Sequence, residues 1–271
     1  MRVVTDDKHY KDIAAAIREN TGTENTYTPE EMPAGVNEVY YKGEYNFFHK
    51  VLLNGGSRTD IENMFKGSGD LSNYAFPENY KPVYTRSLFN GYKGEKLPKG
   101  LNFSNITTSS GTPPFEYLFY NCSNLTEIYD LNIGTKNIFS LNYTFTNCRK
   151  LVKIDTPLRI YSSTTFSYTF SSCDALEEVA FIGAKIQKSI DFKSSQNLSV
   201  KTVKHIIEWL NAWDETSSNA YKNTLTLNQK AFDRLVAAEP TTEWADTEGN
   251  TTQITWEEYI DNKKWNLSLK S

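Results

Sequence analysis

Three segments of the chain align without gaps: Tyr117-Leu-Phe-Tyr-Asn-Cys-Ser-Asn-Leu-Thr-Glu-Ile128, Tyr143-Thr-Phe-Thr-Asn-Cys-Arg-Lys-Leu-Val-Lys-Ile154 and Tyr168-Thr-Phe-Ser-Ser-Cys-Asp-Ala-Leu-Glu-Glu-Val179. Each begins with Tyr, followed by Phe two positions later and then by Cys, Leu and Ile or Val at intervals of three. One such unit cannot bury its apolar face alone, so the pattern predicts units that stack on one another.

Weaker copies of the pattern flank these three segments. Upstream, Phe65-Lys-Gly-Ser68-Gly-Asp-Leu71 keeps the spacing of Phe, a small residue and Leu, and Leu88-Phe89-Asn-Gly-Tyr92 keeps the opening before an insertion. Downstream, Phe192-Lys-Ser-Ser195-Gln-Asn-Leu198 is the last copy. The predicted core of the stack consists of the Phe, Cys and Leu positions: Phe65, Phe89, Phe119, Cys122, Leu125, Phe145, Cys148, Leu151, Phe170, Cys173, Leu176, Phe192 and Leu198.

Each unit is expected to contain a short helical or irregular turn that carries Phe and Cys, followed by a short strand that carries Leu and Ile. Strands of successive coils should lie about 4.8 Å apart. The Cys position needs a small residue, and buried Cys behaves as a small hydrophobe. Ser68 and Ser195 at this position favour packing over chemistry. No metal site is expected, because the cysteines lack the paired C-x-x-C spacing of zinc ligands.

The repeats resemble the BspA-like class of leucine-rich repeat, whose units read roughly as A/T-F-x-x-C-x-x-L-x-x-I. The resemblance covers about residues 60–200, and the periods are longer than is usual in that class. It implies an α/β solenoid, a leucine-rich repeat stack that displays a binding surface. We place this unit at residues 46–199, between an N-terminal helical segment (1–45) and a small α/β C-terminal cap (200–271).

The N-terminal segment is expected to form two helices. Residues 6–20 place apolar side chains, including Ile13 and Ile17, on one helical face, and Thr28 is an N-cap candidate for a second helix. The stretch from Ile13 to Met32 is similar to an opening found in tail-associated proteins of phages and prophages. That resemblance implies attachment to a virus particle, with Ile13, Ile17 and Met32 as candidate attachment residues and other virion tail proteins as partners.

The C-terminal residues are expected to alternate helices and strands. Residues 200–213 predict an amphipathic helix, 224–227 a strand, 229–238 a helix capped by Asn228, and 256–269 a segment that ends in a strand. This ending resembles the C-terminal caps of phage-borne leucine-rich repeat proteins, although Lys264-Trp265-Asn-Leu267 lacks their Gly. Residues 241–252 are interpreted as an inserted, mobile loop.

No motif for catalysis, a metal or a cofactor is found, and we do not expect an enzyme. The three histidines are scattered, and His205 is predicted to be solvated on the polar side of its helix. The adjacent pairs Glu177-Glu178 and Glu257-Glu258 point apart, whereas a glycan depolymerase needs paired carboxylates. The net charge of −4, without a dense basic cluster, argues against nucleic acid as a partner.

Two interpretations of Tyr117, Tyr143 and Tyr168 remain open. These residues recur in register, so they predict a column along the stack. The column is either a half-buried ladder with packed rings and wet hydroxyls, or an aromatic strip that binds a sugar or a protein.

We therefore expect a non-enzymatic structural protein of a phage tail or baseplate, with a repeat surface for recognition of, or adhesion to, a bacterial cell-surface protein or glycan. Residues 1–10 lack an apolar signal region, and no stretch suits membrane insertion, so the protein is expected to be made in the host cytoplasm and to reach the virion. A homo-oligomer in the particle is expected. The alternatives are a bacterial BspA-like surface adhesin and a cell-surface glycan depolymerase.

Overall fold

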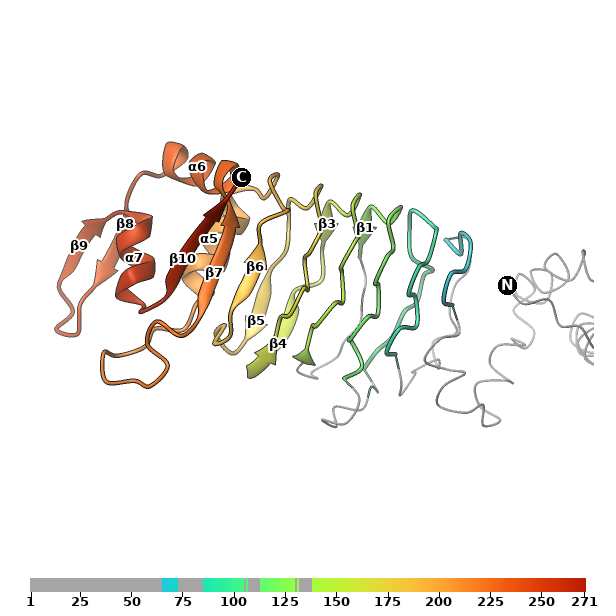
Figure 1. Ribbon diagram of the computed structural model, residues 1–271, viewed down its shortest axis with the longest axis horizontal. Helices are drawn as coiled ribbons and strands as arrows, with labels where there is room; N and C mark the ends of the chain where they lie inside the picture. Colours follow the sequence, from blue (N-terminus) through green and yellow to red (C-terminus); the bar gives the residue numbers. More distant parts are fainter. Residues whose placement is uncertain (1–64, 73–84, 105, 107–112, 130, 132–137) are drawn as a thin grey trace, which may run out of the picture.

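The computed structural model describes residues 65–72, 85–104, 106, 113–129, 131 and 138–271. The predicted N-terminal attachment segment, with Ile13, Ile17 and Met32, lies outside the described residues. Between residues 65 and 198 the described segments form successive coils that lie side by side, and the C-terminal residues close the far end of this row (Figure 1).

The described strands are short, and most of the helical structure is in the C-terminal region. The strands are β1 (Glu127–Ile128), β2 (Ile138–Ser140), β3 (Lys153–Ile154), β4 (Leu158–Thr165), β5 (Phe181–Gly183), β6 (Ile190–Phe192), β7 (Thr224–Asn228), β8 (Thr242–Ala245), β9 (Thr251–Ile254) and β10 (Asn266–Lys270). The helices are α5 (Val200–Trp209), α6 (Gln229–Ala238) and α7 (Trp256–Asn262).

Parallel pairing joins neighbouring coils along three lines. β1 pairs with β3, and the sheets β2-β4-β5 and β6-β7-β10 are also entirely parallel. Isolated bridges from Lys96 to Glu127 and from Lys153 to Glu178 extend the β1-β3 line over four coils. The side chains on this line alternate in charge, and Lys153 Nζ lies 3.4 Å from a Glu178 carboxylate oxygen. Opposite charges in register therefore favour the observed alignment of the coils.

The turn that carries Phe and Cys is held by two alternating kinds of hydrogen bond. In the coil of Phe119, the N–H groups of Tyr117, Phe119 and Asn121 donate to carbonyls of the next coil, over 3.3, 3.0 and 2.8 Å. The N–H groups of Leu118 and Tyr120 donate within the coil, each to the residue three positions earlier. Almost every backbone group of this turn is thereby paired, which lets an irregular segment be packed against its neighbours.

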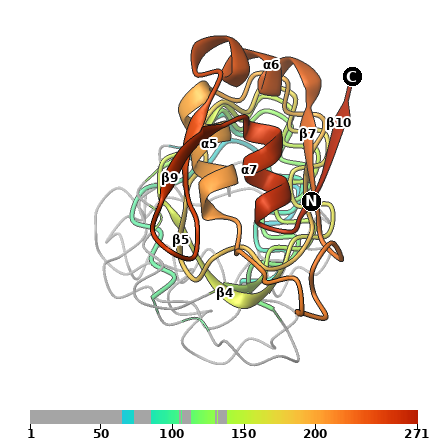
Figure 2. The same ribbon diagram turned by 90° about the vertical axis from the view of Figure 1, so that its left-hand side faces the viewer.

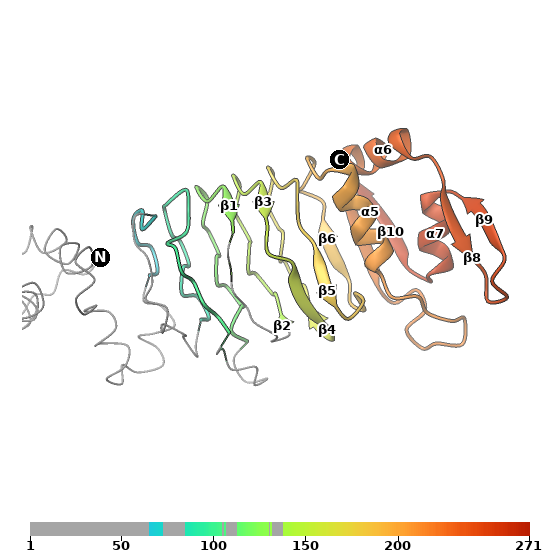
Figure 3. The same ribbon diagram turned by 180° about the vertical axis from the view of Figure 1, so that it is seen from behind.

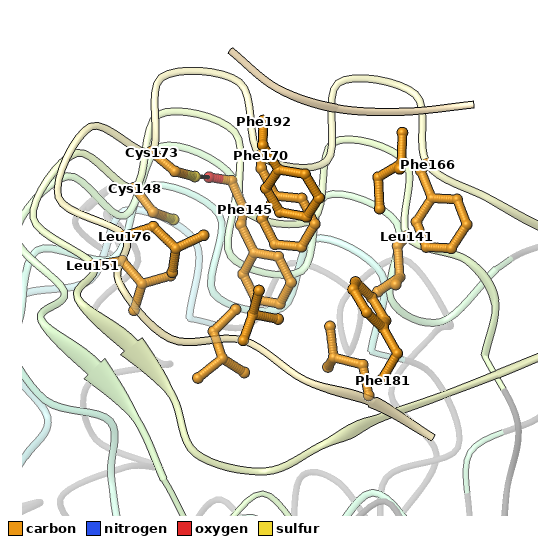
Figure 4. Packing of buried hydrophobic residues seen from close by; sticks show 14 of the residues in the cluster. Leu141, Phe145, Cys148, Leu151, Phe166, Phe170, Cys173, Leu176, Phe181 and Phe192 are labelled. Carbon is orange, nitrogen blue, oxygen red and sulfur yellow. Dashed lines mark hydrogen bonds between the residues drawn. The ribbon is translucent and has the colours of Figure 1, made fainter. Parts of the chain in front are cut away.

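The phenylalanines form one continuous stacked column inside the coils (Figure 4). The centroid distances of successive ring pairs are 5.3, 5.8, 5.9, 5.6 and 4.6 Å, and the interplanar angles are 17° or less. The rings belong, in order, to Phe65, Phe89, Phe119, Phe145, Phe170 and Phe192. Offset stacking at these spacings adds stabilisation beyond the burial of apolar area.

The cysteines form a second buried column beside the phenylalanines. Each thiol donates to the backbone carbonyl of the Phe in the preceding coil: Cys122 to Phe89 (3.1 Å), Cys148 to Phe119 (3.0 Å) and Cys173 to Phe145 (3.1 Å). All three are fully buried and free of disulfides. Ser195, which takes the Cys position in the last copy, donates its hydroxyl to Cys173 O instead. The Cys position thus combines small volume with a donor that links two coils.

The C-terminal region continues the stack and then covers its end (Figure 3). β6 of the last coil pairs with β7, and β7 pairs with β10, while α5 carries buried Val203, Ile206 and Ile207 on its inner face. Asn228 caps α6 by accepting from Lys230 N–H, and Thr255 and Glu258 form a capping box on α7. These caps satisfy N–H groups that a helix start leaves without partners.

Two details of this region differ from the sequence-based predictions. α5 ends at Trp209 rather than at residue 213, because the buried ammonium of Lys263 donates to the carbonyls of Ile207, Glu208 and Leu210. The predicted mobile loop at residues 241–252 contains β8 and the first half of β9, which pair as an antiparallel hairpin. The hairpin packs Trp244 edge-on against Tyr259 of α7, with ring centroids 5.2 Å apart.

His205 is partly buried rather than solvated. Its Nε2 accepts a hydrogen bond from Phe181 N–H over 3.0 Å, and its ring stacks on Trp209 with centroids 5.1 Å apart. Burial lowers the pKa of His205. A protonated Nε2 cannot accept this bond, so the contact between the coil of β5 and α5 requires the neutral imidazole.

Candidate binding surface

The outward column of tyrosines is built on an uncommon backbone conformation. Tyr117, Tyr143 and Tyr168 have φ values of 56°, 57° and 55°, in the left-handed region. Ser87, one coil earlier, has the same conformation with φ of 58°. The left-handed region costs an ordinary side chain about 1–2 kcal/mol, and bulky residues are rare there. This conformation turns each tyrosine outward, two positions before a Phe that turns inward.

A second left-handed column lies four residues further along each turn, and there the residue types are the expected ones. Gly67, Gly91, Asn121, Asn147 and Ser172 occupy it, with φ between 56° and 72°. Glycine and asparagine adopt this region at little cost. The Asn147 amide also donates to the Asn121 side-chain oxygen over 2.7 Å. The same backbone requirement is therefore met by small residues at one column, and by Ser87 and then three tyrosines at the other.

The three tyrosine rings stack on one another as a ridge, which we call the tyrosine ridge (Tyr117, Tyr143 and Tyr168). The centroids of Tyr117 and Tyr143 are 4.8 Å apart with an interplanar angle of 5°, and those of Tyr143 and Tyr168 are 5.1 Å apart with an angle of 14°. Tyr168 is 60% exposed, whereas the other two rings are partly buried. Exposure thus increases toward the C-terminal end of the ridge.

The N-terminal end of the ridge is closed by other side chains. The guanidinium of Arg86, one coil earlier, lies 5.4 Å from the centroid of Tyr117, and the ring of Tyr120 meets Tyr117 edge-on at 5.5 Å. Arg86 is held by an ion pair with Glu116, with Nε and the carboxylate oxygen 3.0 Å apart. Burial raises the pKa of Tyr117, and the neighbouring Tyr143 adds to this rise. The hydroxyl of Tyr117 therefore stays protonated in neutral solution.

Stacking decides which kind of ligand the ridge can hold. A sugar that packs on an aromatic ring needs a free ring face, and the internal faces of this ridge are covered by the neighbouring rings. Tyr117 and Tyr143 stay partly exposed beside their stacked faces, at the spacing of the coils. The outer face of Tyr168, which has no stacked ring partner among the described residues, is the exception. The ridge offers a row of donors and acceptors and one open aromatic face.

A second aromatic pair lies on the β2-β4-β5 sheet. Phe139 and Tyr161 stack with centroids 4.4 Å apart, and Tyr161 is 37% exposed. Between the aligned pairs Ile138–Ile160 and Ser140–Thr165, β2 has one residue and β4 has four, so β4 bulges outward. Thr164 fixes the bulge by accepting from Tyr161 N–H over 2.8 Å and donating to the carbonyl of Ile138. Bulges of this kind commonly redirect a side chain at a functional surface.

The sequence-based prediction missed this second pair. Phe139 and Tyr161 are 22 residues apart, about one coil, and that interval was the available signal. The twelve-residue pattern covers residues 143–154 and 168–179 in these coils. Phe139 and Tyr161 lie outside both copies, so neither residue belongs to the repeat. The coil period alone would have linked them.

The acidic pairs singled out in the sequence have structural partners. Glu178 pairs with Lys153 across coils, and Glu258 belongs to the capping box of α7. Within the part of the chain that the structure describes, no group of three or more His, Cys, Asp or Glu side chains is placed to hold a metal ion. In the same residues, no helix is long and apolar enough to cross a membrane.

The predicted core residues lie together, away from solvent. Phe65 is 6% exposed, and every other Phe, Cys and Leu of the predicted core is at 0%. The cysteines are surrounded by this core, and burial raises the pKa of Cys148 and of Cys173. Such thiols are poor nucleophiles and poor metal ligands, because both roles need the thiolate. The Cys column is therefore a packing feature.

Comparison with known proteins adds no assignment. The chain matches no protein-family model, no curated protein and no solved structure.

Proposed function

We propose that this chain is a non-enzymatic binding protein of a phage or prophage tail, built on BspA-like leucine-rich repeats, and that the tyrosine ridge contacts the bacterial surface. The observation that supports a binding role is the left-handed backbone of Tyr117, Tyr143 and Tyr168. A conformation that disfavours bulky side chains holds tyrosine in three successive coils. Strain of this kind is commonly retained where function requires it.

Tyrosine also has the chemistry that such a role needs. A tyrosine presents a rigid apolar ring and a polar hydroxyl, and it is enriched among the residues that dominate binding energy. The exposed face of Tyr168 suits a sugar ring or an apolar side chain, and the hydroxyls of the ridge suit polar groups beside it. A bacterial glycan or a surface protein offers both kinds of group.

The proposed tail location depends on the resemblance of residues 13–32 to tail-associated proteins, and these residues lie outside the described structure. Deleting residues 1–40 should release the protein from purified particles, as measured by mass spectrometry of the particles. The full-length chain is the control. Retention of the truncated chain at the full-length level would contradict attachment through this segment.

The binding surface is tested with the Tyr168→Asn variant. Asparagine accepts the left-handed backbone, so this change removes the ring without straining the fold. Binding of the purified protein to host cells should weaken by about tenfold or more, because truncating a central tyrosine contact typically costs over 1 kcal/mol.

The matched control is Tyr161→Asn, which removes an exposed ring of the β4 bulge instead. This variant should bind like the unchanged protein. Equal loss in both variants would indicate a general surface effect, and loss in Tyr161→Asn alone would move the binding surface to the bulge. Either result would overturn the assignment to the tyrosine ridge.

The alternatives remain a bacterial BspA-like surface adhesin and a glycan depolymerase. Immunodetection on the surface of the producing bacterium, in the absence of particles, would favour the adhesin. Shortened chains after incubation of the protein with host polysaccharide would favour the depolymerase.

A further inference from the structure

The strand β10 has one free edge. It is the outer strand of the β6-β7-β10 sheet and lies beside β7 (Figure 2). Asn266 N–H donates to the carbonyl of Asn223 over 3.0 Å, which directs the backbone of Asn266, and by alternation that of Ser268 and Lys270, toward β7. The N–H and C=O groups of Leu267 and Leu269 therefore point away from the sheet.

These outward groups have no hydrogen-bond partner among the described residues. An unpaired edge is a template for another strand, and proteins usually block it with a proline, a bulge, an inward charge or a lysine on the edge. β10 has none of these between Asn266 and Leu269, and its only charged side chain is Lys270 at the end. The edge is thus open to a further strand.

A groove lined by both apolar and polar side chains accompanies the edge. It has a volume of about 470 Å³ and lies between α7 and β10, with Ile260, Trp265, Leu267 and Leu269 in its wall. Leu267 and Leu269 lie on the same face of β10 and are only partly buried. A strand added to the edge would bring its own side chains beside these two leucines.

We propose that the occupant is β10 of a second copy of this chain, paired antiparallel about a twofold axis at Ser268. In this register Leu267 faces Leu269 of the partner subunit, and both carry outward backbone groups. Each such pair exchanges two hydrogen bonds, so the two symmetric pairs form four. Ser268 then faces its own copy at the centre. The strand is complementary to itself in backbone polarity and in side-chain type.

The charges at the ends of the strand fit the same arrangement. Lys270 of the partner subunit lies opposite Asn266, at the end of β10 that follows α7 and its acidic residues Glu257 and Asp261. Lys264, the nearby cation, is already paired with Glu215 over 3.2 Å. Opposite charges therefore meet at both ends of the paired strands. The result is an isologous dimer with one continuous sheet through both subunits.

The central position permits a direct test by the Ser268→Cys variant of the full chain. Facing residues of a non-hydrogen-bonded antiparallel pair have Cα atoms about 4.5 Å apart, a distance that a disulfide can span. Mild oxidation should give a disulfide-linked dimer on a non-reducing gel. The native cysteines do not compete, because all three are buried. The matched control is Ser162→Cys, at an exposed residue of the β4 bulge. After the same oxidation this variant should run as a monomer on the non-reducing gel.

A second measurement does not depend on oxidation or on a change inside the strand. Sedimentation of the unchanged chain from about 1 to about 500 μM should show a monomer–dimer equilibrium, as expected of a small interface. Lys270→Glu alters an exposed residue and should weaken the dimer about tenfold by placing like charges together. A monomer at every concentration, equal crosslinking of both cysteine variants, or an unchanged dimer in Lys270→Glu would overturn this arrangement.

Discussion

The repeat stack and the C-terminal region solve the same packing problem in opposite ways. In the stack, the contacts recur from coil to coil: the Phe rings, the Cys thiols and the backbone bonds of the turn are the same in each. In the C-terminal region, individual side chains make contacts that occur only once. Lys263 hydrogen-bonds the end of α5, and His205 accepts a hydrogen bond from the start of β5. The stack distributes its stability over columns, whereas the C-terminal region concentrates it in individual contacts.

The largest expected effect is that of breaking a column. Phe145→Ala should lower the free energy of unfolding by about 3–5 kcal/mol, because it opens a cavity and removes two stacked ring contacts. Phe232→Ala is the comparison, since Phe232 of α6 is equally buried but has no ring partner among the described residues. Urea denaturation of both variants should show the greater loss for Phe145→Ala. Equal losses would mean that stacking adds nothing to burial.

The next effect depends on the buried cation of the C-terminal region. Burial lowers the pKa of Lys263 from 10.5 to about 8, so between these values the unfolded chain binds more protons than the folded one. The free energy of unfolding should therefore rise with pH across this window, by up to about 1.4 kcal/mol per pH unit. Urea denaturation at pH 8 and pH 10 measures the rise.

The control for this prediction is Lys263→Met, which keeps the unbranched stem without the charge. The rise should be absent in this variant, and the difference between the two proteins cancels the titration of other groups. A rise of equal size in both proteins would exclude Lys263 as its source.

A smaller effect on the free energy of unfolding is expected from His205, on the acidic side of neutral pH. Its folded-state pKa lies below the ordinary 6.5, because burial penalises the imidazolium. As the pH falls through this region the unfolded chain takes up more protons, so the free energy of unfolding should decrease. His205→Gln should flatten this part of the pH profile of thermal unfolding. A profile unchanged by the substitution would show that the Phe181–His205 bond does not couple stability to pH.

The smallest effect on stability is expected on the tyrosine ridge. Tyr168→Asn loses one stacked contact, worth about 1 kcal/mol, and relieves a left-handed tyrosine of similar cost. Thermal unfolding should therefore hardly change, even though binding to host cells should weaken. A large destabilisation would instead identify the ridge as part of the structural framework of the stack.

The difference between the two regions also explains what could be predicted from the sequence. The interval between Phe119, Phe145 and Phe170 repeats, so it indicated both the register and the inward direction, and these side chains are buried. The end of α5 could not be predicted, because it depends on Lys263, more than fifty residues further along the chain. The partner of His205 is likewise a backbone group of another coil.

Two further features gave no usable signal. The hairpin β8-β9 exposes polar residues such as Glu243 and Thr251 on both strands, so it lacks the apolar alternation by which strands are recognised. The left-handed conformation of Tyr143 is signalled in other proteins by glycine or asparagine and not by tyrosine. The position of the tyrosine ridge was therefore predictable, while the left-handed backbone that turns its side chains outward was not.

The direction of the hydrogen bonds in the turn makes the coils interchangeable parts. Each coil presents N–H donors to its successor and carbonyl acceptors to its predecessor, as Phe119 N–H does to Thr144 O and Phe145 N–H does to Thr169 O. A gene segment that encodes one whole coil can thus be duplicated or lost in frame without leaving a donor unmatched at the new junction. Each duplication lengthens the molecule by about 4.8 Å and adds one more position to the outer face. Recombination between repeats would then adjust the reach of the protein while the two ends of the chain stay as they are.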